Sequence, residues 1–163
     1  MITADYLRKI LHYNPKTGVF TRLVSSRGHA VGEVAGKSVN SYGYSQIVIK
    51  QKFYKAHRLA WLYMTGEWPP HEIDHINLDK SDNRFCNLRE ATHSQNNANR
   101  RTQINNTAGL KGVGWHKKAQ KWQAQIMVNN KQIYLGCFDC PAAAHFAYIV
   151  AADVHHGDFA RAS

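Results

Sequence analysis

The chain is poor in cysteine and has no long apolar run. Its 163 residues include three cysteines, too few and too unevenly spread for a disulfide framework: Cys86, Cys137 and Cys140. The longest nearly apolar stretch, residues 142–154, contains a histidine and an aspartate and is shorter than the roughly 18–20 residues of a membrane span. No signal-peptide core opens the sequence. We therefore expect a cytoplasmic protein that has no membrane partner.

Acidic residues are also scarce, at 11 against 21 lysines and arginines, which gives a formal charge of +10. The charge is +7 over residues 1–70, zero over 71–104 and +3 over 105–163. A neutral centre between basic flanks is expected if carboxylates gather around a metal while the flanks hold phosphates. The alternative is chance clustering on a hydrated surface. The excess of positive charge favours a polyanionic partner.

The first 70 residues predict a small sheet between two helices. Glycines and an Asn-Pro-Lys-Thr-Gly break separate the elements. The expected elements are a helix capped by Thr3 over residues 4–12, strands over 19–24 and 44–49, and a helix over 56–64 that ends at Thr65-Gly66. We expect this region to contact DNA.

The central segment reads as strand, loop, strand and helix. Two β-prone stretches, residues 72–76 and 87–91, flank a polar loop. Thr92 and Gln95 form a capping box for a helix over residues 93–101. The polar segment 102–108 is the best linker in the chain, and we place a domain boundary there.

The last third predicts three strands and a helix. The strands cover residues 111–116, 121–128 and 131–138, with Asn129-Asn130 suited to a type I′ turn. In the second strand, Trp122, Ala124, Ile126 and Val128 alternate with polar positions. A helix that begins at Pro141 would cover the apolar face with Ala142, Ala143, Phe146, Ala147, Val150, Ala151 and Val154. The predicted fold class is α+β, with a three-stranded antiparallel sheet backed by one helix.

Four polar residues within 23 positions could carry chemistry: Asp74, His75, Asn87 and Asn96. Aspartate and asparagine oxygens suit Mg²⁺, which takes few protein ligands, and an adjacent imidazole can accept the proton of an attacking water. Each residue alone has an ordinary alternative, since a lone histidine is usually a satisfied polar residue and a loop asparagine usually makes a turn.

The runs AHRLAWLYMTGEWPP and EIDHINLDKSDNRFCNLREATHSQNNANR closely resemble the bacteriophage HNH homing endonucleases, which have a ββα-metal fold. The resemblance implies that Asp74 and Asn96 bind Mg²⁺ or Mn²⁺, that His75 is the general base, and that Asn87 holds the loop that aims the histidine. The last motif position is asparagine here rather than histidine, so His93 is a rival ligand. The candidate phosphate contacts near this site are Arg58, Arg84 and Arg89, although the stem of Arg89 could instead pack against the loop.

Residues 109–161 resemble the ethylene-response-factor (APETALA-two) DNA-binding domain through the matches KGV, KW-x-A-x-I and LG-x-F and an alanine-rich helix. Such domains place the solvent-exposed face of their sheet, here called the wet face, in the DNA major groove. The residues expected on that face are Lys111, Trp115, His116, Gln123, Gln125, Met127, Gln132 and Tyr134. The resemblance places the two residues of Cys137-x-x-Cys140 at a strand end and a helix cap, which argues against zinc.

The leading hypothesis is a metal-dependent, site-directed DNA endonuclease that nicks one strand of a duplex as a monomer in a bacterial host cell. Its expected regions are 1–70 for DNA contact, 71–104 for the HNH nuclease core and 105–163 for the ethylene-response-factor-like domain. The main alternative is a sequence-specific DNA-binding regulator with a decayed nuclease centre. RNA binding is a third reading, which lacks a supporting motif.

Overall fold

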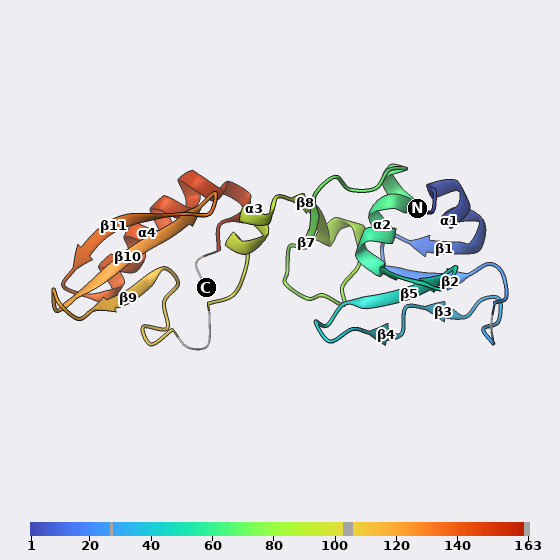
Figure 1. Ribbon diagram of the computed structural model, residues 1–163, viewed down its shortest axis with the longest axis horizontal. Coiled ribbons are helices and arrows are strands. Elements are labelled where there is room, and N and C mark those ends of the chain that lie inside the picture. The colour runs from blue at the N-terminus through green and yellow to red at the C-terminus, as the bar shows by residue number, and fades with distance from the viewer. Residues whose placement is uncertain (27, 103–105, 162–163) are drawn as a thin grey trace. The chain divides into compact units, whose positions relative to one another are not determined.

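The computed structural model describes residues 1–26, 28–102 and 106–161, and the chain divides into two compact units, Met1–Ala91 and Thr92–Ser163 (Figure 1). Part of the predicted linker, residues 103–105, lies outside the described residues. In the part of the chain that the structure describes, no helix combines the length and apolarity needed to cross a bilayer. The division into three functional regions at 70 and 104 stays a prediction.

The first unit combines two α-helices with small antiparallel sheets. Its elements are α1 (Ala4–Ile10), β1 (Leu11–Asn14), β2 (Val19–Arg22), β3 (Val34–Ala35), β4 (Ser38–Val39), β5 (Ser45–Ile49), β6 (Lys52–Lys55), α2 (Ala56–Thr65), β7 (Glu72–His75), the 3₁₀ turn η1 (Phe85–Asn87) and β8 (Leu88–Ala91). Strands β1-β2-β3 form one sheet, β4-β5-β6 a second and β7-β8 a two-stranded ribbon.

The core of this unit is built from side chains of both helices and of the β1–β2 and β5 strands. Its fully buried members are Tyr13, Phe20, Leu7, Leu11, Ile47, Leu59 and Leu62. Full burial of one such side chain contributes about 1.5–3 kcal/mol. The rings of Tyr13 and Phe20 lie 4.7 Å apart. This cluster supports β7 and β8, which contribute Ile73 and Leu88 to it.

Helix α1 ends two residues earlier than the sequence predicts, and the prediction of a helix to His12 is wrong. Leu11 and Tyr13 are buried while His12 and Asn14 are exposed, which is the period of a strand. Pairing of β1 with β2 outweighs the local helical preference. The Thr3 cap is confirmed, because the Thr3 hydroxyl accepts from the Tyr6 amide at 3.3 Å.

The second unit is a three-stranded antiparallel sheet with a helix along one face, as predicted (Figure 1). Its elements are α3 (His93–Ala98), β9 (Val113–His116), β10 (Lys121–Val128), β11 (Lys131–Phe138), α4 (Pro141–His156) and η2 (Gly157–Phe159). The β10 and β11 bounds are those expected, and Asn129 and Asn130 have φ angles of 49° and 62°. The predicted turn between β10 and β11 is thus confirmed.

The capping box of α3 is present: the Thr92 hydroxyl accepts from the Gln95 amide, and the Gln95 side chain accepts from the Thr92 amide. The helix ends at Ala98 rather than Arg101, so its predicted length is wrong. The Arg100 amide donates to the Asn97 carbonyl at 3.2 Å, a tightened turn that closes the helix early. Asparagines at positions 96, 97 and 99 are poor helix formers.

The predicted buried face of α4 is only partly right. Ala147 and Ala151 pack against the core as predicted. Ala144, Tyr148 and Ala152, which the sequence did not single out, face the sheet and are at most 4% exposed, whereas the predicted Phe146 and Val154 are 68% and 74% exposed. The periodicity alone fits either stripe, since apolar residues lie on both. Packing selects the small alanines because they let the helix approach the sheet closely, and Tyr148 fills the remaining space above Gly112.

This assignment predicts opposite effects of two substitutions. Ala152→Leu should lower the free energy of unfolding by about 1–3 kcal/mol, because the buried position cannot hold the added atoms. Val154→Ser should change it by less than about 0.5 kcal/mol, because the side chain lies in water. Urea unfolding followed by circular dichroism measures both. A larger loss of stability for Val154→Ser than for Ala152→Leu would instead support the buried face predicted from the sequence.

Candidate active site and nucleic-acid interface

The antiparallel β7–β8 ribbon places Asp74 opposite Arg89 and His75 opposite Leu88. Neighbouring positions on a strand point to opposite faces, so the two ionisable side chains lie on different sides of the ribbon. Each is only 4% exposed. Two adjacent buried ionisable groups are costly unless each is paired, and here each has a partner, one from the opposite strand and one from the loop.

Asp74 is paired with Arg89 across the ribbon. The Arg89 Nε donates to Asp74 Oδ2 at 2.9 Å, and both side chains are largely buried. Such a charge-assisted contact is short and strong, and it fixes the position of the carboxylate on this side of the ribbon. Arg89, predicted as a phosphate contact, thus holds the carboxylate in this structure.

His75 is held by Asn83 of the loop between the two strands. The His75 Nε2 lies 3.3 Å from Asn83 Oδ1, and the Asn83 amide nitrogen donates to the Ser81 carbonyl at 3.2 Å. The second contact orients the amide so that its oxygen faces the imidazole. Nε2 then carries the proton, and Nδ1 carries the lone pair that makes a base.

The environment keeps this imidazole neutral. Burial lowers the pKa of His75 below its usual range, against the opposing effects of the Asn83 hydrogen bond and of the carboxylates of Asp74, Asp82 and Asp79. A neutral histidine near pH 7 can accept a proton, whereas a protonated one cannot.

Asn87 closes the loop. Its side-chain oxygen accepts from the Asn77 amide at 3.0 Å, and its side-chain nitrogen donates to Asn77 Oδ1 at 2.9 Å and to the Asp82 carbonyl at 2.8 Å. The side chain is buried, so loss of these bonds would leave several polar groups unsatisfied. Asn87 therefore fixes the segment that carries Asn83.

The other two predicted phosphate contacts already have protein partners. Arg84 donates from Nη2 to Asp82 Oδ2 at 2.6 Å, and this guanidinium lowers the pKa of Asp82 to about 2. Arg58 donates to the carbonyls of His71 and Pro69 at 3.0 and 3.2 Å. Contact with phosphate would use the N–H donors of each guanidinium that these partners leave available.

Sequence reasoning missed a second histidine behind the first. The His57 ring lies 5.0 Å from His75, edge to face, and 5.0 Å from Tyr44. It is 4% exposed, and its Nδ1 has no hydrogen-bond partner among the residues that the structure describes. The sequence did carry a signal for the burial of His57, because this residue lies one turn from Ala60 on the apolar stripe of α2. Nothing local pointed to Tyr44.

The β1–β2 hairpin braces the same loop. The Tyr13 hydroxyl donates to the Asn83 carbonyl at 2.7 Å, and the Phe85 amide donates to the Pro15 carbonyl at 3.1 Å. Gly18 has a φ of +74°, and a Cβ added there would lie 2.5 Å from the Asn83 carbonyl carbon. The hairpin backbone thus sits directly against the segment that orients His75.

No three His, Cys, Asp or Glu side chains among the described residues are grouped as a metal-binding set. Magnesium or manganese needs less than that, because these ions keep several waters and use one or two carboxylates. The Asp74 carboxylate fits as a hard donor, and a cation bound there competes with the Arg89 guanidinium. Asn96 and its rival His93 both lie on α3, in the second unit.

The wet face of the C-terminal sheet is partly as predicted. The register pairs Gln125 with Tyr134 and Met127 with Gln132, so these side chains share a face with Gln123 and His116. The Gln123 and Gln132 amides both donate to Gln125 Oε1, at 3.1 and 2.6 Å. The face therefore presents a connected row of amides, while His116 accepts from the Ala119 amide in the adjoining turn.

Two residues were assigned to this face wrongly. Trp115 pairs directly with Trp122, and the two rings meet edge to face at 5.0 Å, so Trp115 lies on the helix side of the sheet. Lys111 precedes β9, and its ammonium donates to the carbonyls of Ala98 and Arg100. Strand β9 starts only at Val113, after Gly112 at a φ of +74°, so Lys111 lies outside the strand. Trp115 lies two residues after the buried Val113 and shares its face, whereas the adjacent His116 lies on the other face.

The two cysteines of the Cys-x-x-Cys sequence have the local places expected for them. Cys137 pairs with Gln123 near the end of β11. Cys140 is the N-cap of α4, and its sulfur accepts from the Ala143 amide at 3.4 Å. Both thiols are free.

His57 predicts an acid-sensitive stability. Burial, together with His75, Lys55 and Arg58, lowers the pKa of His57 to about 3. The unfolded chain binds this proton near pH 6.5, so the stabilisation is present above that pH and is lost as the pH falls toward 3. The slope from this group is at most about 1.4 kcal/mol per pH unit. His57→Phe should flatten the pH dependence of urea unfolding, and His12→Phe, at an exposed position of β1, should leave it unchanged. Parallel curves for the His57 variant and the parent chain would contradict this account.

Comparison with known proteins places this geometry in a family. The model for the HNH endonuclease family matches residues 54–98, which contain α2, the β7–β8 ribbon, its loop and α3. Protein 3.8 of Escherichia phage T7 is 32% identical over 115 residues, which cover 68% of this chain and 94% of that protein. A solved structure on DNA binding and cleavage by the HNH homing endonuclease I-HmuI covers 90% of this chain and 85% of its own, at 17% identity and a TM-score of 0.44. The chain therefore contains an HNH endonuclease domain and belongs to the same family as Protein 3.8.

Proposed function

We propose that the chain is a metal-dependent endonuclease that hydrolyses one phosphodiester bond of double-stranded DNA. In this proposal His75 is the general base, Asp74 and Asn96 are metal ligands, and Asn87 supports the loop. The site acts on DNA held by basic surfaces of the chain, which carries a formal charge of +10.

The observation that carries the proposal is the state of His75. Burial lowers its pKa, and Asn83 Oδ1 accepts a hydrogen bond from Nε2–H, so Nδ1 can accept a proton from water at neutral pH. The imidazole is fixed from behind by the His57 and Tyr44 rings. A decayed centre would have no need of a base that is buried, neutral and oriented at once.

HNH nucleases generally use a divalent metal ion, and Asp74 is the carboxylate best suited to hold one here. Its carboxylate is held by Arg89, which can also stabilise the negative charge that grows on the phosphate. When bound, a divalent ion supplies Lewis-acid stabilisation of the phosphate and of the leaving oxygen. The proton moves from the attacking water to His75 Nδ1.

The C-terminal unit supplies the second part of the proposal. We assign it to DNA docking through the wet sheet face, where the amides of Gln123, Gln125 and Gln132 can donate to and accept from base edges. The resemblance of this unit to the ethylene-response-factor domain, from which the docking mode is taken, is part of the same proposal. Action inside a bacterial host accords with the phage relative.

Removal of the base tests the chemistry. His75→Ala should reduce nicking of plasmid DNA by roughly 10²–10⁴-fold, because general-base catalysis contributes that much. Affinity for duplex DNA, measured in EDTA by fluorescence anisotropy, should stay within about twofold, because the imidazole acts on water. His12→Ala, at an exposed position of the same unit, is the matched control and should nick at the parent rate.

Nicking by the His75→Ala protein at the parent rate would refute the mechanism. If the parent chain binds duplex DNA but does not nick it with Mg²⁺ or Mn²⁺, the chain is a DNA-binding regulator instead.

The number of strands cut tests the proposed monomer. One chain carries one ββ ribbon with one His75, so a single bound copy reaches one scissile phosphate. Separate end-labelling of the two strands should show one of them cut, and the mass of the complex in EDTA should fit one chain per duplex. Equal cutting of both strands by a complex of two chains would contradict this expectation.

A further inference from the structure

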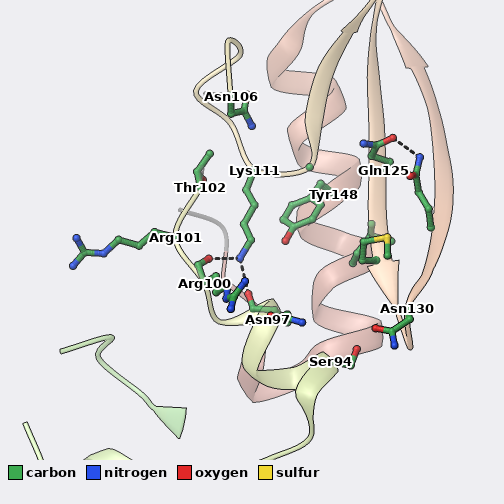
Figure 2. Close-up of a pocket in the computed structure, with 15 residues that line it drawn as sticks. Ser94, Asn97, Arg100, Arg101, Thr102, Asn106, Lys111, Gln125, Asn130 and Tyr148 are labelled. Carbon is green, nitrogen blue, oxygen red and sulfur yellow. Dashed lines mark hydrogen bonds between the residues drawn. The ribbon is translucent and has the colours of Figure 1, made fainter. Parts of the chain in front are cut away.

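The second unit contains a cavity of about 530 Å³ beside the open edge of β10 (Figure 2). Strand β9 pairs only with residues 121–124 of β10, so the following stretch of β10 has no strand on that side. The cavity is closed there by α3, by the segment around Lys111 and by Tyr148 of α4. Its volume is in the range of pockets that hold a small molecule or a nucleotide.

The lining is cationic and amide-rich. Three of the fifteen lining residues are cations, Arg100, Arg101 and Lys111, and none of the fifteen is acidic. Figure 2 shows Arg100 beside the Lys111 ammonium, while Arg101 extends away from the other lining side chains. The amides of Gln125 and Asn130 lie on the opposite side of the cavity. An enclosure with this lining favours an anion that also has hydrogen-bonding groups.

Lys111 is the most informative of the cations. Its ammonium donates to the carbonyls of Ala98 and Arg100, which fixes its position and leaves the third donor of the group for another acceptor. Within the described part of the chain, no carboxylate lies within ion-pair distance of it. Burial, together with Arg161, lowers the pKa of Lys111 to about 8, as expected of a cation without a counter-charge.

Tyr148 supplies a polar group to the same cavity. The residue is 4% exposed and lines the cavity, so its hydroxyl is a hydrogen-bonding group at the cavity wall. The ring cannot move aside easily, because it lies over Gly112, where an added Cβ would overlap it, and stacks with His145. The hydroxyl therefore offers a fixed donor to a molecule inside the cavity.

We infer that this cavity binds one nucleotide of the DNA strand, with its phosphate at Lys111, Arg100 and the Tyr148 hydroxyl. The inference rests on the proposed function for the source of the nucleotide. Gln125 and Gln132 belong both to the cavity lining and to the wet sheet face, so DNA on that face reaches the cavity without a gap. The amides can then meet the base edge of the inserted nucleotide.

The test uses the full chain in EDTA, so that binding is measured without cleavage. Inorganic phosphate and thymidine 5′-monophosphate are titrated separately against the ¹⁵N-labelled protein and followed by NMR, and duplex DNA is titrated by fluorescence anisotropy. The variants are Lys111→Met and Tyr148→Phe. Lys117→Met, at an exposed position before β10, is the control that removes the same charge outside the cavity.

Both phosphate probes should shift amide signals around the cavity, in residues 97–102, 111–112, 125–132 and 148. Lys111→Met should weaken thymidine 5′-monophosphate at least about tenfold, as expected for a lost hydrogen bond to a charged group, and Tyr148→Phe about threefold or more. Lys117→Met should weaken it less than twofold. Both cavity variants should also weaken duplex binding more than Lys117→Met does.

Several results would overturn the inference. One is the absence of shifts around the cavity with either probe, and another is an equal loss of affinity in all three variants. If Lys111→Met unfolds the chain, Tyr148→Phe decides the matter, since it removes only a hydroxyl. If the mononucleotide binds but duplex affinity is unaffected by the cavity variants, the ligand is a free nucleotide and not a DNA strand. A failure of the parent chain to nick DNA bears on the proposed function alone.

Discussion

The burial of two adjacent ionisable residues, Asp74 and His75, is the constraint around which the first unit is organised. A strand sends them to opposite faces, so one partner cannot serve both. Arg89 comes from the neighbouring strand by register, whereas Asn83 must come from the loop. To bring Asn83 to His75, the loop must be long enough to return across the end of the ribbon. It must also be polar enough to hydrogen-bond its own backbone there.

The loop is held by side chains in place of regular structure. Asn87 joins its two ends, Asp82 holds the turn through Arg84, and Lys80 donates to the Tyr42 carbonyl at 2.8 Å. A set of this kind is cooperative, since each bond presupposes the geometry of the others. The loop is thus held in place without regular structure of its own.

Local features of the fold could be predicted from the sequence, and features that depend on distant packing could not. The capping box at Thr92 and the Asn129-Asn130 turn are short-range patterns with a direct physical cause, and both are present. The buried face of α4 was predicted only in part because two apolar stripes compete and only the sheet decides between them. Trp115 was misplaced because it and the adjacent His116 were assigned to one face, whereas the burial of Val113 puts Trp115 on the helix side.

The candidate site shows the same division. Asp74, His75 and Asn87 were found through a spaced motif, and the structure brings these three together on the ribbon and its loop. The residues that surround them, Tyr44 and His57, come from elements about 20 to 30 positions earlier. Their role arises from packing, which a reading along the chain cannot supply.

The contact of Gly18 with the backbone at Asn83 separates chemical importance from mutational sensitivity. Gly18 has no side chain and lies 57 positions before His75, yet any side chain there would press on the peptide that holds His75. A random screen for loss of the proposed activity would therefore report this hairpin glycine together with the proposed site residues. Its position in such a list would describe the mechanical support of the loop, carried through the backbone, and would say nothing about the reaction itself.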